Sequence, residues 1–423
     1  MNLPNQWAMK TLEELGSCHI GLTYKPENVV SSDGTLVLRS SNIQQSRLVF
    51  NDNVFVNIEV PSKLIVENGD ILVCVRNGSR SLIGKSAVIE QEHLTEEITF
   101  GAFMSIYRTK HHDYVRHLFH SDMYYRQIRN NLGATINQIT NKNLNSFSFP
   151  FPLNSSERNQ IAKILSTVDK KIDLIDQKIA ETENLKTGLM QKLFSEGVGV
   201  QDSDGTWQPH SEFQDSKFGQ IPSSWKTQSL KQIGDCLIGL TYKPEDTTDN
   251  SGTLVLRSSN VQNNRIELNN NVYVKCKVSE SIQIKKGDIL ICVRNGSRSL
   301  IGKSALIGQD MRNTTFGAFM SVFRTPLSEL IYQLFQTEMY RKQILKNLGA
   351  TINQITNKNL YSFEFPIPPE NERKEIVKIL TTIDRKVDLL TKQKAETQQL
   401  KKGLMQKLLT GEWRVPLDNP EAA

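Results

Sequence analysis

The chain has 423 residues, of which 38% are hydrophobic, and this length and composition allow two or three ordinary globular domains. Lysine and arginine exceed aspartate and glutamate by 51 to 45, and the formal net charge of +6 favours a polyanionic partner without excluding others. The sequence has no apolar run long enough to cross a membrane and no secretory signal at its start, MNLPNQWAMK, so we expect a cytoplasmic protein.

The second half of the sequence repeats the first half, with an offset that falls from 218 to 216 and then to 215. So long a period indicates duplication of a whole domain rather than a solenoid. Three segments recur without a substitution: IGLTYKP at 20–26 and 238–244, GTLVLRSSN at 34–42 and 252–260, and LGATINQITNKNL at 132–144 and 348–360. A fourth segment, GDILVCVRNGSRSLIGKSA at 69–87, returns at 287–305 with 18 of 19 residues unchanged.

We expect the first copy, 1–153, and the second copy, 218–368, to form two similar domains. Apolar alternation with β-branched residues predicts short strands in TLVLRSS, YVKCKV and DILICVR, separated by turn signals such as Asp-Gly and Asn-Gly. The segments around Tyr114–Asn131 and Glu329–Asn347 have helical patterns. The predicted fold class is therefore α+β, with twisted, partly closed β-sheets.

A long helix is predicted after each domain, at 154–195 and at 369–411, because apolar residues alternate there every four and three positions. We assign a coiled-coil seam to Ile161, Leu165, Val168, Ile172, Ile175 and Ile179 and, in the second copy, to Ile376, Leu380, Ile383, Val387 and Leu390. A single stripe of this kind favours an oligomerisation helix. Two matched copies in one chain favour an internal antiparallel pair, which separates the two domains and gives the chain an approximate two-fold axis. An exposed connector at 196–217 and a tail at 412–423 complete the chain.

Motifs for catalysis and metal binding are missing from the sequence. The string NGSRSLIGKS at 77–86 resembles a phosphate-binding P-loop, but five residues rather than four separate Gly78 from Gly84. The five cysteines contain no CxxC pair, so we expect reduced, buried thiols rather than a zinc site. The second domain repeats the motifs without any histidine, so we expect His111 and His112 to be a solvated pair. No dinucleotide-binding fingerprint and no base-flipping tetrapeptide of an amino-methyltransferase occurs. We therefore expect no catalytic or metal site, and no cofactor, in this chain.

The repeated polar segments carry the candidate binding residues, because Arg, Lys, Asn and Gln suit base edges and phosphates. In the first domain the candidates for DNA contact are Tyr24, Lys25, Arg39, Asn42, Arg76, Asn77, Ser79, Arg80, Lys85, Asn137, Gln138, Asn141 and Lys142. In the second domain they are Tyr242, Lys243, Arg257, Asn260, Arg294, Asn295, Ser297, Arg298, Lys303, Asn353, Gln354, Asn357 and Lys358.

Each polar segment also has a purely structural interpretation. RNGSRSLIGKS at 76–86 is compatible with a solvated hairpin whose Asn-Gly turn has positive φ. In ATINQITNKNL at 134–144, Asn141 could cap a short helix instead of contacting adenine. Both interpretations stay open from the residues alone.

The layout resembles the specificity subunit of type I restriction-modification systems. The resemblance covers nearly the whole chain and is carried by the order domain, long helix, domain, long helix. It is also carried by LPNQW at 3–7 and IPSSW at 221–225, by FPFPLNSSERNQIAKIL at 149–165 and FPIPPENERKEIVKIL at 365–380, and by the ending GLMQKLLTGEWRV at 403–415.

This resemblance implies that each domain is a target-recognition domain for one half of a bipartite double-stranded DNA site. It also implies that the helices set the spacing and hold two modification subunits, which would carry S-adenosylmethionine and methylate adenine. Restriction subunits that use ATP would join for cleavage. Family members commonly carry unlike domains, whereas the candidate segments here are almost identical. We therefore predict an interrupted, near-palindromic target.

A second class of function explains the duplicated shape equally well. A scaffold with two β-rich domains on a coiled coil could bind a protein or a glycan. It explains less readily why the Arg, Asn, Gln and Lys strings are identical in both copies while the connector has no counterpart. Binding that falls steeply with salt concentration would favour DNA.

Overall fold

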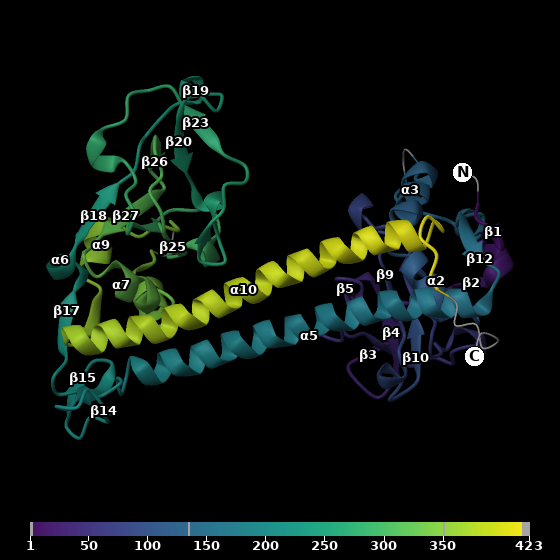
Figure 1. Ribbon diagram of the computed structural model, residues 1–423, viewed down its shortest axis with the longest axis horizontal. Helices are drawn as coiled ribbons and strands as arrows, with labels where there is room; N and C mark the ends of the chain where they lie inside the picture. The colour runs from purple at the N-terminus through teal and green to yellow at the C-terminus, as the bar shows by residue number, and fades with distance from the viewer. Residues whose placement is uncertain (1–2, 134–135, 350–351, 417–423) are drawn as a thin grey trace. The chain divides into compact units, whose positions relative to one another are not determined.

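The computed structural model describes residues 3–133, 136–349 and 352–416, and the chain divides into two compact units. The first unit contains residues 1–177 and 391–423, and the second contains residues 178–390. Each unit therefore holds one globular domain, the first part of the long helix that follows this domain, and the last part of the other long helix (Figure 1). Residues 134–135 and 350–351, which begin the two ATINQITNKNL segments, and tail residues 417–423 lie outside the described residues.

The elements of the two units correspond one to one through most of the domain. The strands of the first unit are β1 (Trp7–Thr11), β2 (Ser17–Ile20), β3 (Val29–Val30), β4 (Thr35–Leu38), β5 (Ile43–Gln44), β6 (Arg47–Leu48), β7 (Phe55–Val56), β8 (Ile71–Cys74), β9 (Ser86–Val88), β10 (Ile98–Phe100), β11 (Met104–Arg108) and β12 (Ser148–Pro152). Its short helices are α1 (Leu12–Leu15), α2 (His112–Leu118), α3 (Asp122–Asn131) and α4 (Asn141–Asn145). The two long helices are α5 (Ser155–Leu193) and α10 (Glu370–Leu408).

The second unit contains two hairpins in and after the connector, which have no counterpart among the described residues of the first. They are β13 (Val200–Gln201) with β14 (Trp207–Gln208), and β15 (Phe213–Ser216) with β16 (Gly219–Pro222). The remaining strands are β17 (Lys226–Ser229), β18 (Asp235–Ile238), β19 (Thr247–Thr248), β20 (Thr253–Leu256), β21 (Val261–Gln262), β22 (Arg265–Ile266), β23 (Val272–Val274), β24 (Ile289–Cys292), β25 (Ser304–Leu306), β26 (Thr314–Phe316), β27 (Met320–Arg324) and β28 (Glu364–Ile367). The short helices are α6 (Leu230–Ile233), α7 (Ser328–Leu334), α8 (Glu338–Asn347) and α9 (Asn357–Tyr361).

An antiparallel sheet, β2-β11-β8-β9 in the first unit and β18-β27-β24-β25 in the second, forms the centre of each domain. Along β8, Ile71 and Val73 belong to the apolar cluster that includes the helices, whereas Leu72 and Cys74 belong to the cluster beneath the second sheet. That second sheet, β10-β4-β7-β3, is mixed, because β10 pairs with β4 in parallel. The central sheet is thus buried on both faces, which explains the uninterrupted apolar run of β8.

Each predicted domain helix is in fact a pair of helices, with a break at Ser121 in the first domain and at Thr337 in the second. The hydroxyl of Ser121 accepts a hydrogen bond from the backbone N–H of Tyr124, so it caps a new helix, α3, directly after α2. Thr337 caps α8 in the same way. The helical segments expected around 114–131 and 329–347 are therefore confirmed, each divided in two because a capping side chain ends one helix and begins the next.

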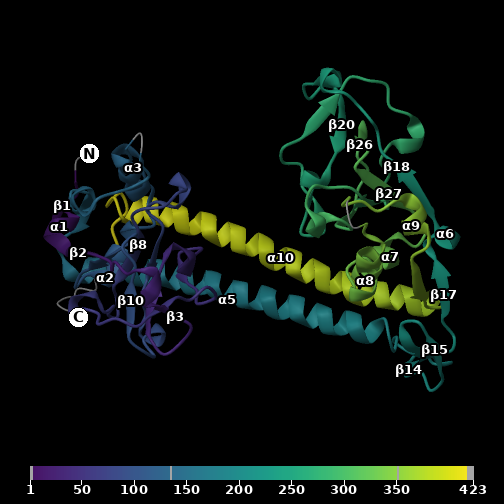
Figure 2. The ribbon, with the colours of Figure 1, turned by 180° about the vertical axis from the view of Figure 1, so that it is seen from behind.

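Within each unit a segment of α5 and a segment of α10 lie side by side and run antiparallel. In the first unit, Lys401 contacts Asp169 at 2.6 Å and Lys394 contacts Asp176 at 2.5 Å. A later residue of α5 therefore pairs with an earlier residue of α10, as antiparallel helices require. In the second unit Lys186 contacts Asp384 at 2.7 Å, and these two residues stand at the positions of the repeat that correspond to Lys401 and Asp169. Figures 1 and 2 show the two segments together from opposite sides.

The seam residues assigned from the sequence are all buried or half-buried along the two helices. Ile161 and Leu165 pack with Leu408 and Leu409 in the core of the first unit. Ile376 and Leu380 pack with Met190, Leu193 and Phe194 in the second. Ile172, Ile175 and Val387 are also buried, and Val168, Ile179, Ile383 and Leu390 are half-buried.

A buried glutamate in the first turn of each long helix ties that helix to the strand at the start of the domain. Glu157 is fully buried and accepts hydrogen bonds from Trp7 Nε1 at 3.2 Å and from Arg414 Nε at 2.5 Å. In the second unit, Glu372 accepts from Trp225 Nε1 at 2.7 Å and from His210 Nε2 at 2.9 Å. The segment after α10 therefore completes the first domain, as the connector after α5 completes the second.

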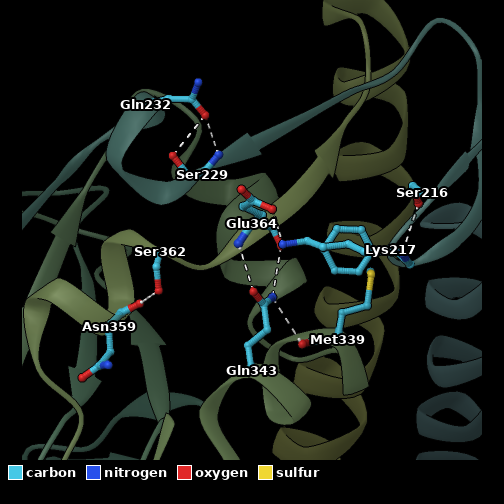
Figure 3. Close-up of polar contacts among 10 residues, drawn as sticks. Ser216, Lys217, Ser229, Gln232, Met339, Gln343, Asn359, Ser362 and Glu364 are labelled. Carbon is cyan, nitrogen blue, oxygen red and sulfur yellow. Dashed lines mark hydrogen bonds and ion pairs between the residues drawn. The ribbon is translucent and has the colours of Figure 1, made fainter. Parts of the chain in front are cut away.

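Side chains of the second unit also fix the last strand of the domain to its helices (Figure 3). The side-chain oxygen of Gln343, on α8, accepts from the backbone N–H of Glu364 at 3.0 Å, while its Nε2 donates to the Glu364 carbonyl at 3.0 Å. The carboxylate of Glu364 pairs with Lys217 of the connector. In the first domain Gln127 holds the backbone of Ser148 in the same way. Within the described ranges, no helix has both the length and the apolar composition of a membrane span.

We predict that replacing Arg414 with Met destabilises the first unit by about 1–3 kcal/mol, because the buried Glu157 carboxylate loses a charged donor. Hydrogen exchange of the β1 and β12 amides measures the free energy of the unfolding that exposes these two strands. Replacing Lys407, whose ion pair with Glu412 is on the surface, is the matched control and should change it by less than about 0.5 kcal/mol. Equal effects of the two substitutions would contradict the role assigned to Arg414.

Candidate nucleic-acid interface

The two repeated polar segments meet at one end of the central sheet. The loop 76–85 joins β8 to β9, and its first residue, Arg76, forms an isolated bridge with Gln138. Backbone hydrogen bonds run from Ile139 N to the carbonyl of Val75 at 2.8 Å and from Asn77 N to the carbonyl of Asn137 at 3.3 Å. In the second domain Arg294 bridges Gln354, and Ile355 N donates to Val293 at 2.8 Å. Segments 60 residues apart in the sequence thus form one surface in each domain.

Asparagine side chains hold this surface together. Asn77 Nδ2 donates to Ser40 Oγ at 3.0 Å, and Asn77 Oδ1 accepts from Ser79 N at 3.0 Å. Asn137 Nδ2 donates to the carbonyl of Gly78 at 2.9 Å. In the second domain Asn295 and Asn353 make the same contacts, at 2.9–3.0 Å. We therefore reassign these four asparagines, which the sequence suggested as base contacts, to the positioning of the loops.

The two glycines of the loop, Gly78 and Gly84, differ in whether the fold requires glycine at that position. Gly84 has φ +85, and an added Cβ would lie 3.0 Å from Ile128, so the fold itself demands glycine there. Gly78 lies outside the left-handed region, and no heavy atom would lie within 4 Å of an added Cβ. The proposed hairpin turn with positive φ at Asn-Gly was therefore wrong. The Asn77 side chain makes the turn instead, and the loop continues into a 3-10 helix at Arg80–Leu82 and then a strand, not the helix of a P-loop.

Asn141 neither caps a helix nor faces solvent freely. Thr140 is the N-cap of α4, with Asn143 completing the capping box. The side-chain oxygen of Asn141 accepts from Ser105 Oγ at 3.0 Å, and Asn357 accepts from Ser321 in the same way. The capping interpretation of Asn141 was therefore wrong by one residue, and this side chain anchors α4 to β11.

Arg39 and Asn42, with Arg257 and Asn260, shape a neighbouring loop. Asn42 and Asn260 are fully buried and donate to backbone carbonyls, so we withdraw both from the residues that could contact DNA. Arg39 donates to Asp52 at 2.8 Å, and Arg257 donates to the carbonyl of Asn270 at 3.0 Å. Both arginines are half-buried.

The side chains that remain available at this end of the sheet are mostly cationic. In the first domain Lys25, Arg76, Arg80 and Lys142 are exposed, and Tyr24, Lys85 and Gln138 are half-buried. Lys243, Arg294, Arg298 and Lys358 are exposed in the second, and Tyr242, Lys303 and Gln354 are half-buried. The hydroxyl groups of Ser79 and Ser81 hydrogen-bond to each other, as do those of Ser297 and Ser299. Each domain therefore presents an electropositive surface with an arginine at its centre.

Sequence reasoning missed one aromatic residue in each surface. Phe103 is 56% exposed and Phe319 is 57% exposed, and each ring lies under the guanidinium of the central arginine, at 4.9 Å for Arg76 and 5.0 Å for Arg294. The signal that could have found them is the segment TFGAFMS, which is identical at 99–105 and 315–321.

The buried histidines have a structural explanation. His117 contacts Ser166 at 3.2 Å and lies 3.7 Å from Asp169 of α5. At the equivalent position of the second domain, Gln333 donates to Asp384 at 2.7 Å. Burial holds the pKa of His117 well below its usual value and lowers the pKa of His120 to about 3, so both are neutral at pH 7. An uncharged glutamine side chain can therefore occupy the positions of His117 and His120 in the second domain. His111 and His112 are half-buried rather than freely solvated.

The five cysteines are free, but the expectation that all are buried was wrong for Cys18, Cys236 and Cys276, which are half-buried. Cys74 and Cys292 are buried, and desolvation raises the pKa of each thiol to about 11. In the parts of the chain that the structure covers, no three His, Cys, Asp or Glu side chains are grouped to hold a metal ion.

Comparison with known proteins identifies the chain's relatives. A family model described as the type I restriction modification DNA specificity domain matches residues 4–184 and 222–399. The EcoKI specificity subunit of Escherichia coli strain K12 is 25% identical over 450 residues, covering 99% of this chain and 92% of the relative. The putative MjaX specificity subunit of Methanocaldococcus jannaschii is 28% identical over 437 residues, covering 98% and 95%.

Solved structures agree on the fold. The type I restriction-modification S subunit from M. genitalium aligns with a TM-score of 0.56 and 16% identity, covering 97% of this chain and 98% of that one. The α+β domains and long helices expected from the sequence are thus confirmed.

We predict that the first unit loses stability as the pH falls from about 6.5 toward 3, because the unfolded chain then binds protons that folded His117 and His120 do not. The double variant H117Q/H120Q, which copies the second domain, should remove most of this dependence. Acid titration of hydrogen exchange in α2 measures it. A variant as acid-sensitive as the original would show that other groups are responsible.

Proposed function

This chain belongs to the family of type I restriction-modification DNA specificity domains and recognises a DNA sequence within a restriction-modification complex, and we propose that its two domains recognise equivalent half-sites. The observation that carries the proposal is the identity of the two surfaces. Arg76 and Arg294 occupy the same place over a phenylalanine ring, and the asparagine contacts around them repeat to within about 0.1 Å. Equivalent surfaces select equivalent bases, so the target is interrupted and near-palindromic.

The available side chains divide naturally between bases and phosphates. Arg76 and Gln138, joined by the bridge between the two segments, are the candidates for base edges, since guanidinium and amide groups can bind guanine and adenine in a bidentate manner. The exposed Lys25, Arg80 and Lys142 are candidates for phosphate contacts, which fix register rather than sequence.

The long helices offer two equivalent surfaces for partner subunits. The first unit exposes Leu174 of α5 and Leu400 of α10, at 56% and 55%, and the second exposes the equivalent Leu389 and Leu185, at 68% and 55%. Gly188 and Gly403, three residues after Leu185 and Leu400, have no heavy atom within 4 Å of an added Cβ. Since glycine weakens a helix, close approach of a partner helix would explain both positions. We assign these surfaces to two modification subunits.

Catalysis belongs, in this proposal, to those partners. The modification subunits would bind S-adenosylmethionine and methylate adenine, and restriction subunits would use ATP, while this chain contributes no catalytic group or cofactor. The complex would act on DNA in the cytoplasm. The competing scaffold function is not favoured, because a surface for proteins or glycans does not require exposed cations around a central arginine in both domains.

Reconstitution tests the function directly. The chain, combined with its modification subunits and S-adenosylmethionine, should methylate DNA at one defined sequence, with a binding affinity that falls steeply with salt. Modification subunits without this chain should methylate no defined sequence. Methylation that is independent of this chain would overturn the assignment.

We predict that Arg76→Ala costs about 1–3 kcal/mol of binding and relaxes the bases accepted in one half-site only. Arg294→Ala should relax the other half-site to a similar degree. The measurement is methylation of a library randomised in both half-sites. Unchanged base preferences in the R76A/R294A double variant would remove both arginines from base recognition.

Gly78→Ala should lower the affinity for DNA without lowering the stability of the fold. Alanine fits the backbone and meets no atom, so the substitution should leave stability unchanged or raise it by up to about 1 kcal/mol. If the loop backbone approaches DNA closely, the same methyl group should lower affinity for sites that are intact in that half by about tenfold. Gly84→Ala is the contrasting variant, since positive φ and Ile128 make it destabilising. Full affinity in G78A would contradict a close approach at this loop.

A further inference from the structure

An apolar cluster near the central arginine is exposed to solvent in both domains. Its members are large, exposed and equivalent between the copies: Ile20 (64%), Phe103 (56%) and Ile136 (57%) in the first domain, and Ile238 (70%), Phe319 (57%) and Ile352 (55%) in the second. Isolated exposed apolar residues are ordinary, but the same three at the same place twice indicate a contact surface.

Backbone contacts show that these residues flank Arg76. The carbonyl of Phe103 accepts hydrogen bonds from both Val75 N and Arg76 N, at 3.1 Å each. Ile20 ends β2 one residue before Gly21, whose N–H donates to Met104 at 3.3 Å. Ile136 lies two residues before Gln138, the bridge partner of Arg76. The apolar cluster therefore lies inside the candidate interface and not beside it.

The surrounding charge identifies the occupant. Exposed Arg76, Arg80 and Lys142 would each be left unpaired beneath an apolar protein segment, whereas duplex DNA provides phosphates for them. The major groove of duplex DNA carries one apolar group, the 5-methyl group of thymine. The Phe103 ring stabilises the guanidinium from one face and leaves its in-plane N–H groups free for a base edge.

We propose that Phe103 and Phe319, with the neighbouring isoleucines, are specificity-determining residues that contact thymine methyl groups, one set in each half-site. Because the Phe103 ring lies against the Arg76 guanidinium, at 4.9 Å, we expect the thymine next to the base that Arg76 contacts. This inference rests on the proposed function, because it assigns a base to a surface already assigned to DNA.

Replacement of thymine by 2′-deoxyuridine tests the inference, because it removes the methyl group and keeps every hydrogen-bonding group. Each thymine of both half-sites is replaced in turn, and binding by the complex with modification subunits is measured. One thymine in each half-site should be sensitive, with affinity about fourfold lower, the effect of one buried methyl group. The intact protein is used, so no variant needs to fold.

Variants then locate the contact. Phe103→Ala should abolish the sensitivity in one half-site and leave the other unchanged, and Phe319→Ala should do the reverse, so each serves as the control for the other. Phe213→Ala, at an exposed phenylalanine of β15, should change neither.

Three outcomes would overturn the inference: no sensitivity to any deoxyuridine, half-sites without thymine, or undiminished sensitivity in both phenylalanine variants. In each of these the intact protein still binds a defined sequence. Failure of the intact protein to bind any sequence would instead overturn the proposed function.

Discussion

Burial of the central sheet on both faces is the constraint on which the rest of the structure depends. With Ile71 and Val73 packed toward the helices and Leu72 and Cys74 packed toward the second sheet, neither face of β8 can meet a ligand. Solvent is reached only beyond the ends of β8, and at one end the loop after β8, the start of β11 and the segment before α4 converge. A rigid sheet that presents loops at its end can hold Arg76 in one orientation, which selective contact with a base edge requires.

Duplication shows which contacts the surface needs and which can change. The hydrogen bonds of Asn77 and Asn137 recur in Asn295 and Asn353 with nearly the same lengths. The supporting contacts are less constrained, because His117 is replaced by Gln333, and the donors to the buried glutamate are Arg414 in one unit and His210 in the other. Since different residue types make these contacts in the two copies, these positions tolerate change, whereas the loop contacts are the same in both.

Much of this architecture was predictable from sequence, because the repeat and the four-and-three apolar spacing are long-range signals. The fold class, the two long helices and the convergence of the two polar strings on one function follow from such patterns. The roles of individual polar residues do not, since Asn is equally suited to a base, a turn or a cap, and only the partner atom decides. Asn42 is buried, Asn77 makes the turn and also donates to Ser40, and Asn141 accepts from Ser105; the contacts with Ser40 and Ser105 join segments far apart in the chain. Phe103 shows the converse case, in which an apolar residue of the candidate interface faces solvent.

The central claim is that two equivalent surfaces recognise equivalent half-sites. Long-read mapping of modified adenines in the source genome tests it most directly, because it reports both half-sites and the gap between them. The account predicts one motif whose two halves are inverted copies, or nearly so, separated by bases of any identity. Two unrelated half-sites would contradict it.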